Sequence, residues 1–360
     1  EIRQGRALPN PQLAVTHESL GDYSESYLNL TQPVDFLWES RSRGGRAEAL
    51  GLQARARFLA DSARLALEVR QAYLEAWRAT EARRAYRQAE GLMAQLLASA
   101  EARFAEGDIA GYDLRRLRLE HRQFERRSAT VELDLEEAEQ RLGVLLLATD
   151  DRRRVSARGM GGGEMTADVP SDPVAQALTH RPEIQAAEAL AEARSNETTL
   201  SRASVLRGTS LTGGLKRQSD GSDGLFMGLA IPLPIADRRG GAIDAAQAAV
   251  LAAESELDLL RRAVAQQVSI ASSRLRTAQR QQELLGAAGG REAEELLAIA
   301  RLSFAEGEMR AVDLLDAAEA FLEARLLETE IRADLWDAYF ELEQAVGGFS
   351  AESDNGVNER

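Results

Sequence analysis

Two carboxylate residues lie at the end of the glycine-centred phrase SFAEGEMRAVDL at residues 303–314: Asp313 within the phrase and Asp316 two positions after it. Carboxylates three positions apart lie on neighbouring positions of one helix face, where together they can attract cations. The same residues could instead be solvated acids of a first helical turn, in which negative charge interacts favourably with the helix dipole. Both interpretations remain open at this point.

Other chemistry-bearing residues do not form recognisable sites. His17, His121 and His180 are far apart in sequence, cysteine is absent, and no HExxH or paired-histidine motif occurs, so we expect neither a metal site nor a cofactor. The glycine-rich run at residues 159–164 lacks the lysine and hydroxyl of a phosphate-binding loop. Because no nucleophile stands beside a base, the sequence predicts that the protein is not an enzyme.

Composition favours a helical protein. The 360 residues are rich in Ala, Leu, Glu and Arg, and only 5% are aromatic, which is typical of long helices. The net charge of −14 disfavours nucleic acid as a partner. No apolar run is long enough for a transmembrane helix. The chain begins with Glu1 and not with Met, so we expect that an N-terminal piece has been removed.

The phrase RFAEGDIAGYDL at residues 103–114 recurs at residues 303–314 with six identical residues at a constant offset of 200 positions. Gly107 and Gly307 lie in the two copies. Glycine commonly ends helices because it adopts the left-handed conformation without steric cost. We therefore predict two helical hairpins, each with its tip at one copy of the phrase.

Long helical stretches surround both tips. Residues 46–106 and 242–306 contain no proline, and residues 114–145 and 314–345 carry apolar residues at the alternating 3-4 spacing of a heptad seam. Helices of this length cannot bury an apolar face within one small protomer. We therefore expect an elongated bundle that is shared between chains.

Three polar residues fall on the heptad seams. Ser128 and Glu328 interrupt the two seams at the same place, and His121 occupies the position that Phe321 has in the second copy. A packing role for His121 is therefore favoured over metal ligation.

Strand-like segments precede the long helical stretches. The clearest begins at Leu225, after which apolar residues alternate as far as Leu233. The turn SDGSDG at residues 219–224 joins this segment to a predicted strand at residues 209–217. A less regular hairpin is expected around PNPQLAVTHESL at residues 9–20.

These elements divide the chain into seven predicted segments. They are residues 1–45, the end of a truncated helix and the first β-hairpin; 46–149, the first long helical hairpin, with its tip near 104–114; 150–173, a linker; 174–207, a helix of the second repeat; 208–237, the second β-hairpin; 238–346, the second long helical hairpin, with its tip near 304–317; and 347–360, a polar tail.

The sequence resembles the outer membrane factor family, the TolC-like exit ducts of bacterial efflux and secretion systems, over nearly its whole length. The similarity rests on RPEIQAAEA (181–189), IPLPIADRRGGAI (231–243) and FAEGEMRAVDLLDA (304–317), in this order and with the twofold repetition. Together with LPNPQLAV (8–15), the second of these phrases most resembles the CzcC-like branch, which works with heavy-metal RND pumps.

The resemblance implies a mainly α protomer with a small β part. Three such protomers would form a duct with a 12-stranded β-barrel in the outer membrane of a Gram-negative bacterium and an α-barrel in the periplasm. The implied partners are a periplasmic adaptor, an inner membrane RND pump and outer membrane lipid. Strand residues implied to face lipid are Leu211, Leu215, Met227, Leu229 and Ile231.

The resemblance also assigns roles at the tips. The implied adaptor-contact residues are Gly107, Asp108 and Ile109 in the first tip and Gly307, Glu308 and Met309 in the second. Asp313 and Asp316 would ring the periplasmic gate.

The implied function is conduction of substrate, with metal cations favoured, from pump and adaptor to the exterior. The alternative is a soluble coiled-coil scaffold without a membrane span, which needs no alternating strands. Neither the exported substrate nor the identity of the pump follows from the sequence.

Overall fold

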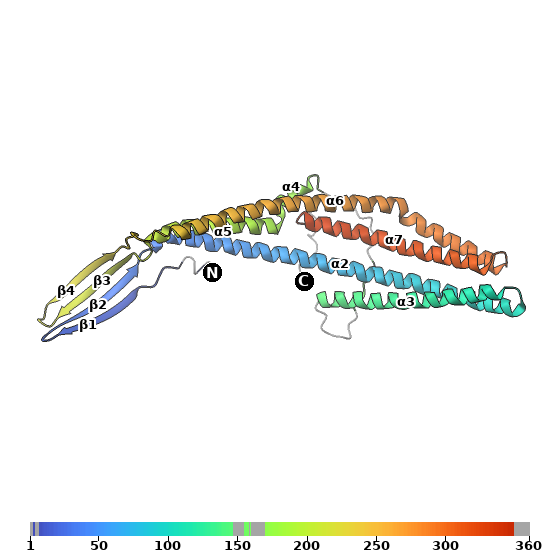
Figure 1. The fold of residues 1–360 in the computed structure, drawn as a ribbon, viewed down its shortest axis with the longest axis horizontal. Helices are drawn as coiled ribbons and strands as arrows, with labels where there is room; N and C mark the ends of the chain where they lie inside the picture. The colour runs from blue at the N-terminus through green and yellow to red at the C-terminus, as the bar shows by residue number, and fades with distance from the viewer. Residues whose placement is uncertain (1–2, 4–6, 147–154, 158, 160–169, 349–360) are drawn as a thin grey trace, which may run out of the picture. The chain divides into compact units, whose positions relative to one another are not determined.

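The computed structural model describes residue 3 and residues 7–146, 155–157, 159 and 170–348. Four strands and several helices make up this part of the chain (Figure 1). Their bounds are β1 Gln12–Leu20, β2 Tyr23–Pro33, α2 Phe36–Glu106, α3 Gly111–Leu145, α4 Pro173–His180, α5 Pro182–Ala203, the 3-10 helix η1 Ser204–Leu206, β3 Ser210–Gln218, β4 Asp223–Ala230, α6 Gly240–Ala305 and α7 Ala311–Ala345.

The strands form one antiparallel sheet in the order β1-β2-β3-β4. Two hairpins supply the outer pairs, and β2 pairs with β3 across the sequence repeat, with Leu28 opposite Leu215. The strands contain between 8 and 11 residues, close to the 9–11 residues of a transmembrane β-strand. Ile231, which was predicted to lie in the last strand, comes one residue after β4 because Pro232 has no N–H to continue the ladder.

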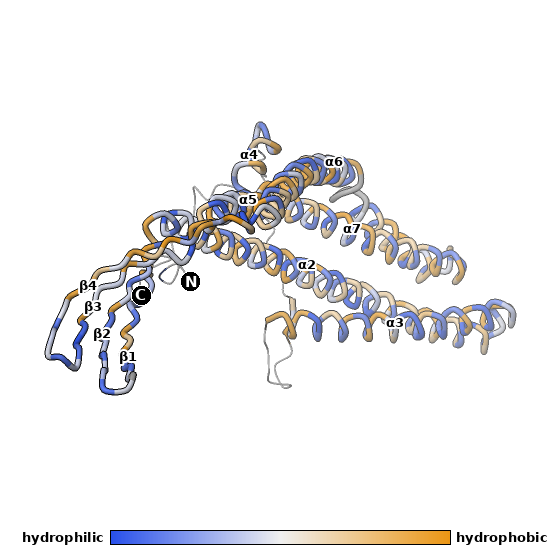
Figure 2. The backbone as a smooth tube through the Cα atoms, turned by 60° about the vertical axis from the view of Figure 1, so that its left-hand side comes forward, coloured by the Kyte–Doolittle hydropathy of each residue, from blue (hydrophilic) through white to orange (hydrophobic). Residues whose placement is uncertain are grey.

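The two faces of the sheet differ in polarity. Because side chains alternate along a strand, the observed register puts nine apolar residues on one face. All nine are more than 40% exposed: Leu13, Val15, Leu28, Leu30, Leu211, Leu215, Leu225, Met227 and Leu229. Figure 2 shows hydrophobic residues recurring along the strands. This set is called the apolar face of the sheet below.

The opposite face carries a polar network centred on Glu25. The Glu25 carboxylate accepts hydrogen bonds from the hydroxyls of Tyr23, at 2.6 Å, and Tyr27, and from Nε2 of Gln218 at 2.8 Å. The Nζ atom of Lys216 lies 2.7 Å from the same carboxylate. The network therefore joins β2 to β3 on the face opposite the apolar side chains.

Helix α2 begins ten residues earlier than the sequence predicts, at Phe36 and not near Arg46. The Gly-Gly pair at residues 44–45, which precedes the predicted start of the helix, is itself helical. A Cβ atom on Gly45 would lie 3.0 Å from the side chain of Asn196 in α5. Gly45 therefore permits close packing of α2 against α5.

The chain divides into two compact units, residues 1–61 with 178–265 and residues 62–177 with 266–360. The first unit holds the sheet, α5 and the adjoining parts of α2 and α6. The second holds α3, α7, both tips and the remaining parts of α2 and α6. The seven-segment division is finer than this one and stays a prediction.

Side chains of four helices form the core of the second unit near the tips. Leu114, Leu117 and Phe124 of α3 pack with residues of α2, α6 and α7, and all three are at most 4% exposed. His121, on the same seam, is 20% exposed and lies 3.6 Å from Glu125.

Parts of four predicted segments lie outside the described residues: most of residues 1–8, residues 147–149 at the end of the first helical hairpin, most of the linker and most of the tail. None of the helices in the described part is long and apolar enough to cross a membrane. Within the same residues, no group of three or more His, Cys, Asp or Glu side chains could hold a metal ion.

Candidate functional site

The first tip is a helix end capped by its own backbone. Gly107 has φ of +87°, and its N–H donates to the carbonyl of Phe104 at 3.1 Å, while the N–H of Asp108 donates to the carbonyl of Arg103 at 2.9 Å. These two bonds form a Schellman motif, which satisfies carbonyls left free at the end of α2. The next helix starts at Gly111, only a few residues later.

The second tip repeats this geometry. Gly307 has φ of +82°, its N–H donates to Phe304 at 3.1 Å, and the N–H of Glu308 donates to Ser303 at 2.9 Å. Glycine is needed at both positions because other residues rarely adopt positive φ. The repeated phrase therefore encodes the same turn twice.

The predicted adaptor-contact residues separate into two groups. The side chains of Asp108 and Glu308 are exposed at the tips, together with both turn glycines. Ile109 and Met309 are half-buried and pack against the core shared by the two hairpins. The charged residues are thus available to a partner, while the apolar ones mainly anchor the turns.

The structure joins the two tips through Arg103, which sequence reasoning missed. Its Nη2 atom donates to the carbonyl of Phe304 at 3.0 Å, and its guanidinium lies 4.6 Å from the centre of the Phe304 ring. The second copy of the phrase has Ser303 in place of an arginine, and Phe104 is 46% exposed. The first tip therefore has no equivalent of the contact between Arg103 and Phe304 within the described residues. Arg103 therefore holds the last turn of α6 to the first hairpin.

The carboxylate of Asp313 is paired with the guanidinium of Arg310. The Nε and Nη2 atoms of Arg310 donate to its two carboxylate oxygens at 3.0 and 2.8 Å. This contact holds the pKa of Asp313 below its ordinary value. Arg310 precedes Asp313 by three positions at the start of α7, a spacing that was visible in the sequence but was not interpreted.

Asp316 lies one turn further along α7 and its side chain is exposed. The hydrogen bonds to Asp313 raise the pKa of Arg310, and the charges of Asp113 and Asp316 raise it further, so acids of both hairpins act on this guanidinium. At the position matching Asp316, the first hairpin has an exposed arginine, Arg116. The second tip is therefore the more acidic one, as the sequence indicated, but Arg310 compensates one of its two carboxylates.

Four of the five predicted lipid-facing residues belong to the apolar face of the sheet: Leu211, Leu215, Met227 and Leu229. Ile231 follows β4 and is 53% exposed. Leu13, Val15, Leu28 and Leu30 of the first hairpin lie on the same face and were not singled out. Their alternation is weaker in the sequence because His17 and Glu18 interrupt it.

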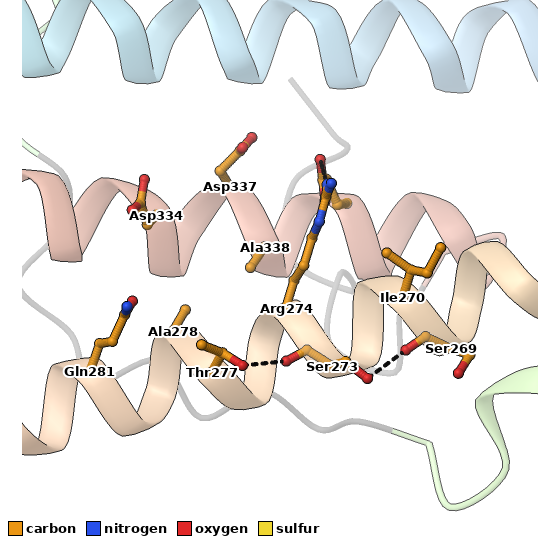
Figure 3. Close-up of a pocket in the computed structure, with 11 residues that line it drawn as sticks. Ser269, Ile270, Ser273, Arg274, Thr277, Ala278, Gln281, Asp334, Asp337 and Ala338 are labelled. Atoms are coloured by element: carbon orange, nitrogen blue, oxygen red, sulfur yellow. Dashed lines mark hydrogen bonds and ion pairs between the residues drawn. The ribbon is translucent and has the colours of Figure 1, made fainter.

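A polar groove of about 540 Å³ lies between α6 and α7 in the second unit (Figure 3). The hydroxyls of Ser273 and Thr277 donate to carbonyls one turn earlier in α6, at 2.9 and 3.0 Å, and Arg274 forms a bidentate contact with Glu341. Hydroxyls engaged with their own helix backbone are not activated nucleophiles. The groove therefore offers solvated polar surface and no catalytic arrangement.

Comparison with known proteins gives a family match for the second repeat. Residues 174–348 match the sequence profile described as outer membrane efflux protein. This part of the chain, just under half of its length, is similar to the outer membrane efflux proteins. The match covers the second repeat with its β-hairpin, both arms of its helical hairpin and the second tip. No curated protein sequence is significantly similar to the chain.

Solved channel structures share the fold of the whole chain. The outer membrane protein VceC from Vibrio cholerae is 18% identical with a TM-score of 0.75, and the alignment covers 96% of this chain and 89% of VceC. CusC is 20% identical with a TM-score of 0.71, covering 97% and 86%. The open-state MtrE channel from Neisseria gonorrhoeae is 18% identical with a TM-score of 0.70, covering 96% and 82%.

These similarities confirm the predicted fold class, a mainly helical protomer with four strands. The family match lies in the second half, and the structural similarity extends the same fold over the first. At these identities the similarity to solved structures concerns the fold.

Proposed function

We propose that the protein is the outer membrane channel component of a tripartite efflux system. The observation that carries this proposal is the apolar face of the sheet, whose nine side chains are all exposed in the single chain. So large an exposed apolar set needs a partner or a lipid phase to cover it. The polar network around Glu25 would then face a water-filled lumen, which is the alternation found in transmembrane barrels.

Three copies are needed to make the channel. A four-stranded sheet leaves β1 and β4 with unpaired edges, and such edges are not tolerated in lipid. Three copies would close a 12-stranded barrel, as in the TolC-like ducts that the sequence resembles. The helical hairpins would extend into the periplasm of a Gram-negative bacterium.

The tips would dock a periplasmic adaptor that connects the channel to an inner membrane RND pump. Asp108 and Glu308 are exposed at the two tips and are the side chains best placed for this contact. Because the chain has no cysteine, single cysteines at these two positions provide specific sites for crosslinking. Capture of one adaptor from membranes through both positions is expected, and capture through neither would contradict docking at the tips.

Metal cations are the substrate that we favour, through the CzcC-like resemblance and the acidic second tip. In a closed trimer Asp316 would lie near the axis, where its uncompensated charge attracts cations. Asp313 contributes less, because Arg310 neutralises it. Opening would separate these side chains; the relative solved as an open channel, MtrE, supports the existence of such a state.

Conductance in planar bilayers tests the proposal. The detergent-extracted protein should be a trimer containing strand, and Asp316→Asn should lower the preference for cations measured from the reversal potential. Arg310→Gln should raise this preference because it unmasks Asp313, while Arg310→Lys should leave it near the wild-type value. A water-soluble, entirely helical dimer would instead establish the scaffold alternative. A trimeric channel with unchanged selectivity in all three variants would remove these residues from the gate.

A further inference from the structure

The apolar alternation of β4 continues beyond the end of the sheet. Ile231, Leu233 and Ile235 are 53%, 75% and 80% exposed, whereas Pro232 and Pro234 between them are half-buried. The prolines cannot continue the hydrogen-bonded ladder, and the N–H of Ile235 donates to the carbonyl of Leu233 at 2.8 Å, which closes a tight turn. The segment therefore extends the exposed apolar surface past the last paired residue of β4.

A cation follows these apolar residues, just before α6. Arg238 is exposed and makes no ion pair within the described part of the chain. The backbone beside it is fixed by its neighbours, because the N–H of Arg239 donates to Oδ1 of Asp237 at 2.7 Å and Nη1 of Arg239 donates to the hydroxyl of Ser204 at 2.9 Å. Arg238 therefore lies next to the apolar segment with an uncompensated charge.

The segment that leads from β2 into α2 shows the same order. Leu37, in the first turn of α2, is 67% exposed, and Arg41 is exposed and forms no ion pair with a described residue. Residues four apart lie on one face of a helix, and Arg41 lies about 6 Å further from the sheet along the axis. Both segments belong to the first unit. An apolar residue next to the sheet and a cation beyond it therefore occur wherever a strand leads into one of the long helices.

The hairpin end of the sheet differs from this helix end. Its lysine and its arginine are both paired, Lys216 with Glu25 at 2.7 Å and Arg217 with Asp223 at 2.9 Å. The turns between the strands add two acids and no base. Among the described residues, uncompensated positive charge thus borders the apolar surface at the helix end and not at the hairpin end.

We propose that Arg41 and Arg238 each bind the headgroup phosphate of an anionic phospholipid in the periplasmic leaflet. The inference rests on the proposed function and deepens it by naming the lipid chemistry that the protein recognises. In the proposed channel, the apolar face and the residues that continue it contact acyl chains, and the headgroups lie immediately beyond the acyl chains. The two arginines follow the apolar residues in this same order.

The chemistry of the two arginines favours an anionic headgroup over a zwitterionic one. A guanidinium is always charged and forms paired hydrogen bonds with phosphate oxygens. A zwitterionic headgroup brings its own cation, whereas an anionic headgroup leaves the phosphate charge for the protein to compensate. The exposed apolar residues are continuous with the apolar face of the sheet, so one lipid phase covers both and no separate partner is required.

The attraction has a defined size and salt dependence. One basic side chain at a membrane surface enriches anionic lipid by about fivefold. Salt screens this attraction, because the Debye length falls from about 10 Å at 0.1 M to about 3 Å at 1 M ionic strength. The preference for anionic lipid should therefore decrease at high salt, while the total contact with lipid stays the same.

A single label in the cysteine-free chain tests the assignment. The full chain carrying Ala236→Cys, labelled with a fluorophore, is reconstituted into vesicles of equal parts phosphatidylglycerol and phosphatidylcholine. Bromine on the acyl chains of one lipid or the other quenches the fluorophore, and the ratio of the two quenching efficiencies reports which lipid is enriched. We expect about fivefold enrichment of phosphatidylglycerol at this position. A label at Ser222→Cys, in the turn at the hairpin end, should show no such enrichment.

Substitutions identify the residues responsible. Arg238→Gln should abolish the enrichment at the Ala236→Cys label, and Arg238→Lys should retain most of it because the charge remains. Arg217→Gln is the matched control, an exposed arginine at the other end of the sheet, and should change nothing at this label. A label at Leu37→Cys tests Arg41→Gln in the same way.

A label at Met227→Cys, on the apolar face, separates the two proposals. If neither lipid quenches it, the sheet does not contact lipid and the proposed function fails. If it is quenched but the Ala236→Cys label shows no enrichment, or shows one that Arg238→Gln leaves unchanged, only the phospholipid assignment is overturned. Loss of the enrichment when inorganic phosphate replaces chloride at equal ionic strength would also overturn it, because the arginines would then bind free phosphate in place of lipid.

Discussion

Glu39, at the start of α2, forms an ion pair with Arg207, just before β3, and the two side chains differ in burial. The Glu39 side chain is 3% exposed, while that of Arg207 is 47% exposed. The guanidinium donates from Nε and Nη2 to the two carboxylate oxygens at 3.0 and 3.2 Å. Because a buried carboxylate without a counterion is costly, Arg207 neutralises a charge that the first unit would otherwise hold unpaired.

Arg207→Ala should therefore lower the free energy of unfolding by about 2 kcal/mol, the cost of leaving a buried charged group unsatisfied. The matched control is Arg217→Ala. Arg217 and Asp223 form a similar bidentate pair, but both are exposed, and we expect a loss of about 0.5 kcal/mol. Urea unfolding in detergent measures both, and equal losses would contradict the argument from burial.

A second residue-scale feature is the acidic group around Glu319, between α3 and α7. Burial raises the pKa of Glu319, and the nearby charge of Glu120 raises it further, while Arg127 acts in the opposite direction. The charged form of Glu319 is thus disfavoured in the folded state. Protons bind more readily to the folded than to the unfolded chain at this position.

Glu319→Gln should raise the unfolding midpoint at pH 7 by on the order of 2 °C. The sign follows from linkage. With a raised pKa in the folded state, stability increases as pH falls through that pKa, and the increase is complete below the ordinary value of 4.5. The difference between variant and wild type should therefore disappear at pH 4. Glu330→Gln, on an exposed site, is the control, and a pH-independent gain would contradict the prediction.

At the scale of elements, each long helix carries a glycine at a similar distance before its tip. Nothing lies within 4 Å of a Cβ atom added to Gly91 in α2. In α6 a Cβ atom on Gly290 would lie 2.6 Å from Oε2 of Glu328. Arg325 and Arg332 hold that carboxylate at 3.1 and 3.0 Å. Glu328, the polar residue on the heptad seam of α7, thus packs on Gly290 of the neighbouring helix α6.

Gly91→Ala should stabilise the protein by up to about 1 kcal/mol, because glycine is disfavoured by that amount in a helix interior. Gly290→Ala should instead destabilise it, since the Glu328 carboxylate would have to leave both arginines. Adding Glu328→Ala should recover part of the loss. Thermal unfolding of the variants measures the difference, and equal stabilisation by the two glycine substitutions would refute the close approach.

At the scale of the whole molecule, the two faces of the sheet differ in polarity. Met227, in β4, is 81% exposed on the apolar face, whereas Thr212, in the neighbouring strand β3, lies on the polar face. In the proposed channel these faces meet lipid and lumen respectively. A charge is therefore costly at the first position and tolerated at the second.

Met227→Asp should reduce the yield of trimer in the outer membrane, because a carboxylate facing lipid costs on the order of 2 kcal/mol. Thr212→Asp, at the same level of the sheet, should leave the yield near that of the wild type. The fraction of trimer in outer membrane extracts is the measurement. Equal yields would indicate that the apolar face does not contact lipid.

The sequence alone determined the features that depend on local chemistry. Gly107 and Gly307 predicted both tips because a Schellman turn requires a residue that tolerates positive φ. The alternation in β4 predicted one apolar strand face, and the heptad seam of α3 contains all of its buried residues. In α7 the seam was a weaker guide, because Leu315 and Leu322 are buried off the seam. Each of these signals lies within a few residues of the element that it specifies.

The tertiary structure decided what depends on residues far apart in sequence. Only the fold shows that β2 pairs with β3, that Gly45 is helical because α5 packs on it, and that Arg103 holds the second tip. Such contacts leave no local pattern, because the partner side chain arrives from another part of the chain. Arg310 combines both kinds of information. The sequence shows that it lies three positions before Asp313, but only the structure shows that it neutralises this carboxylate.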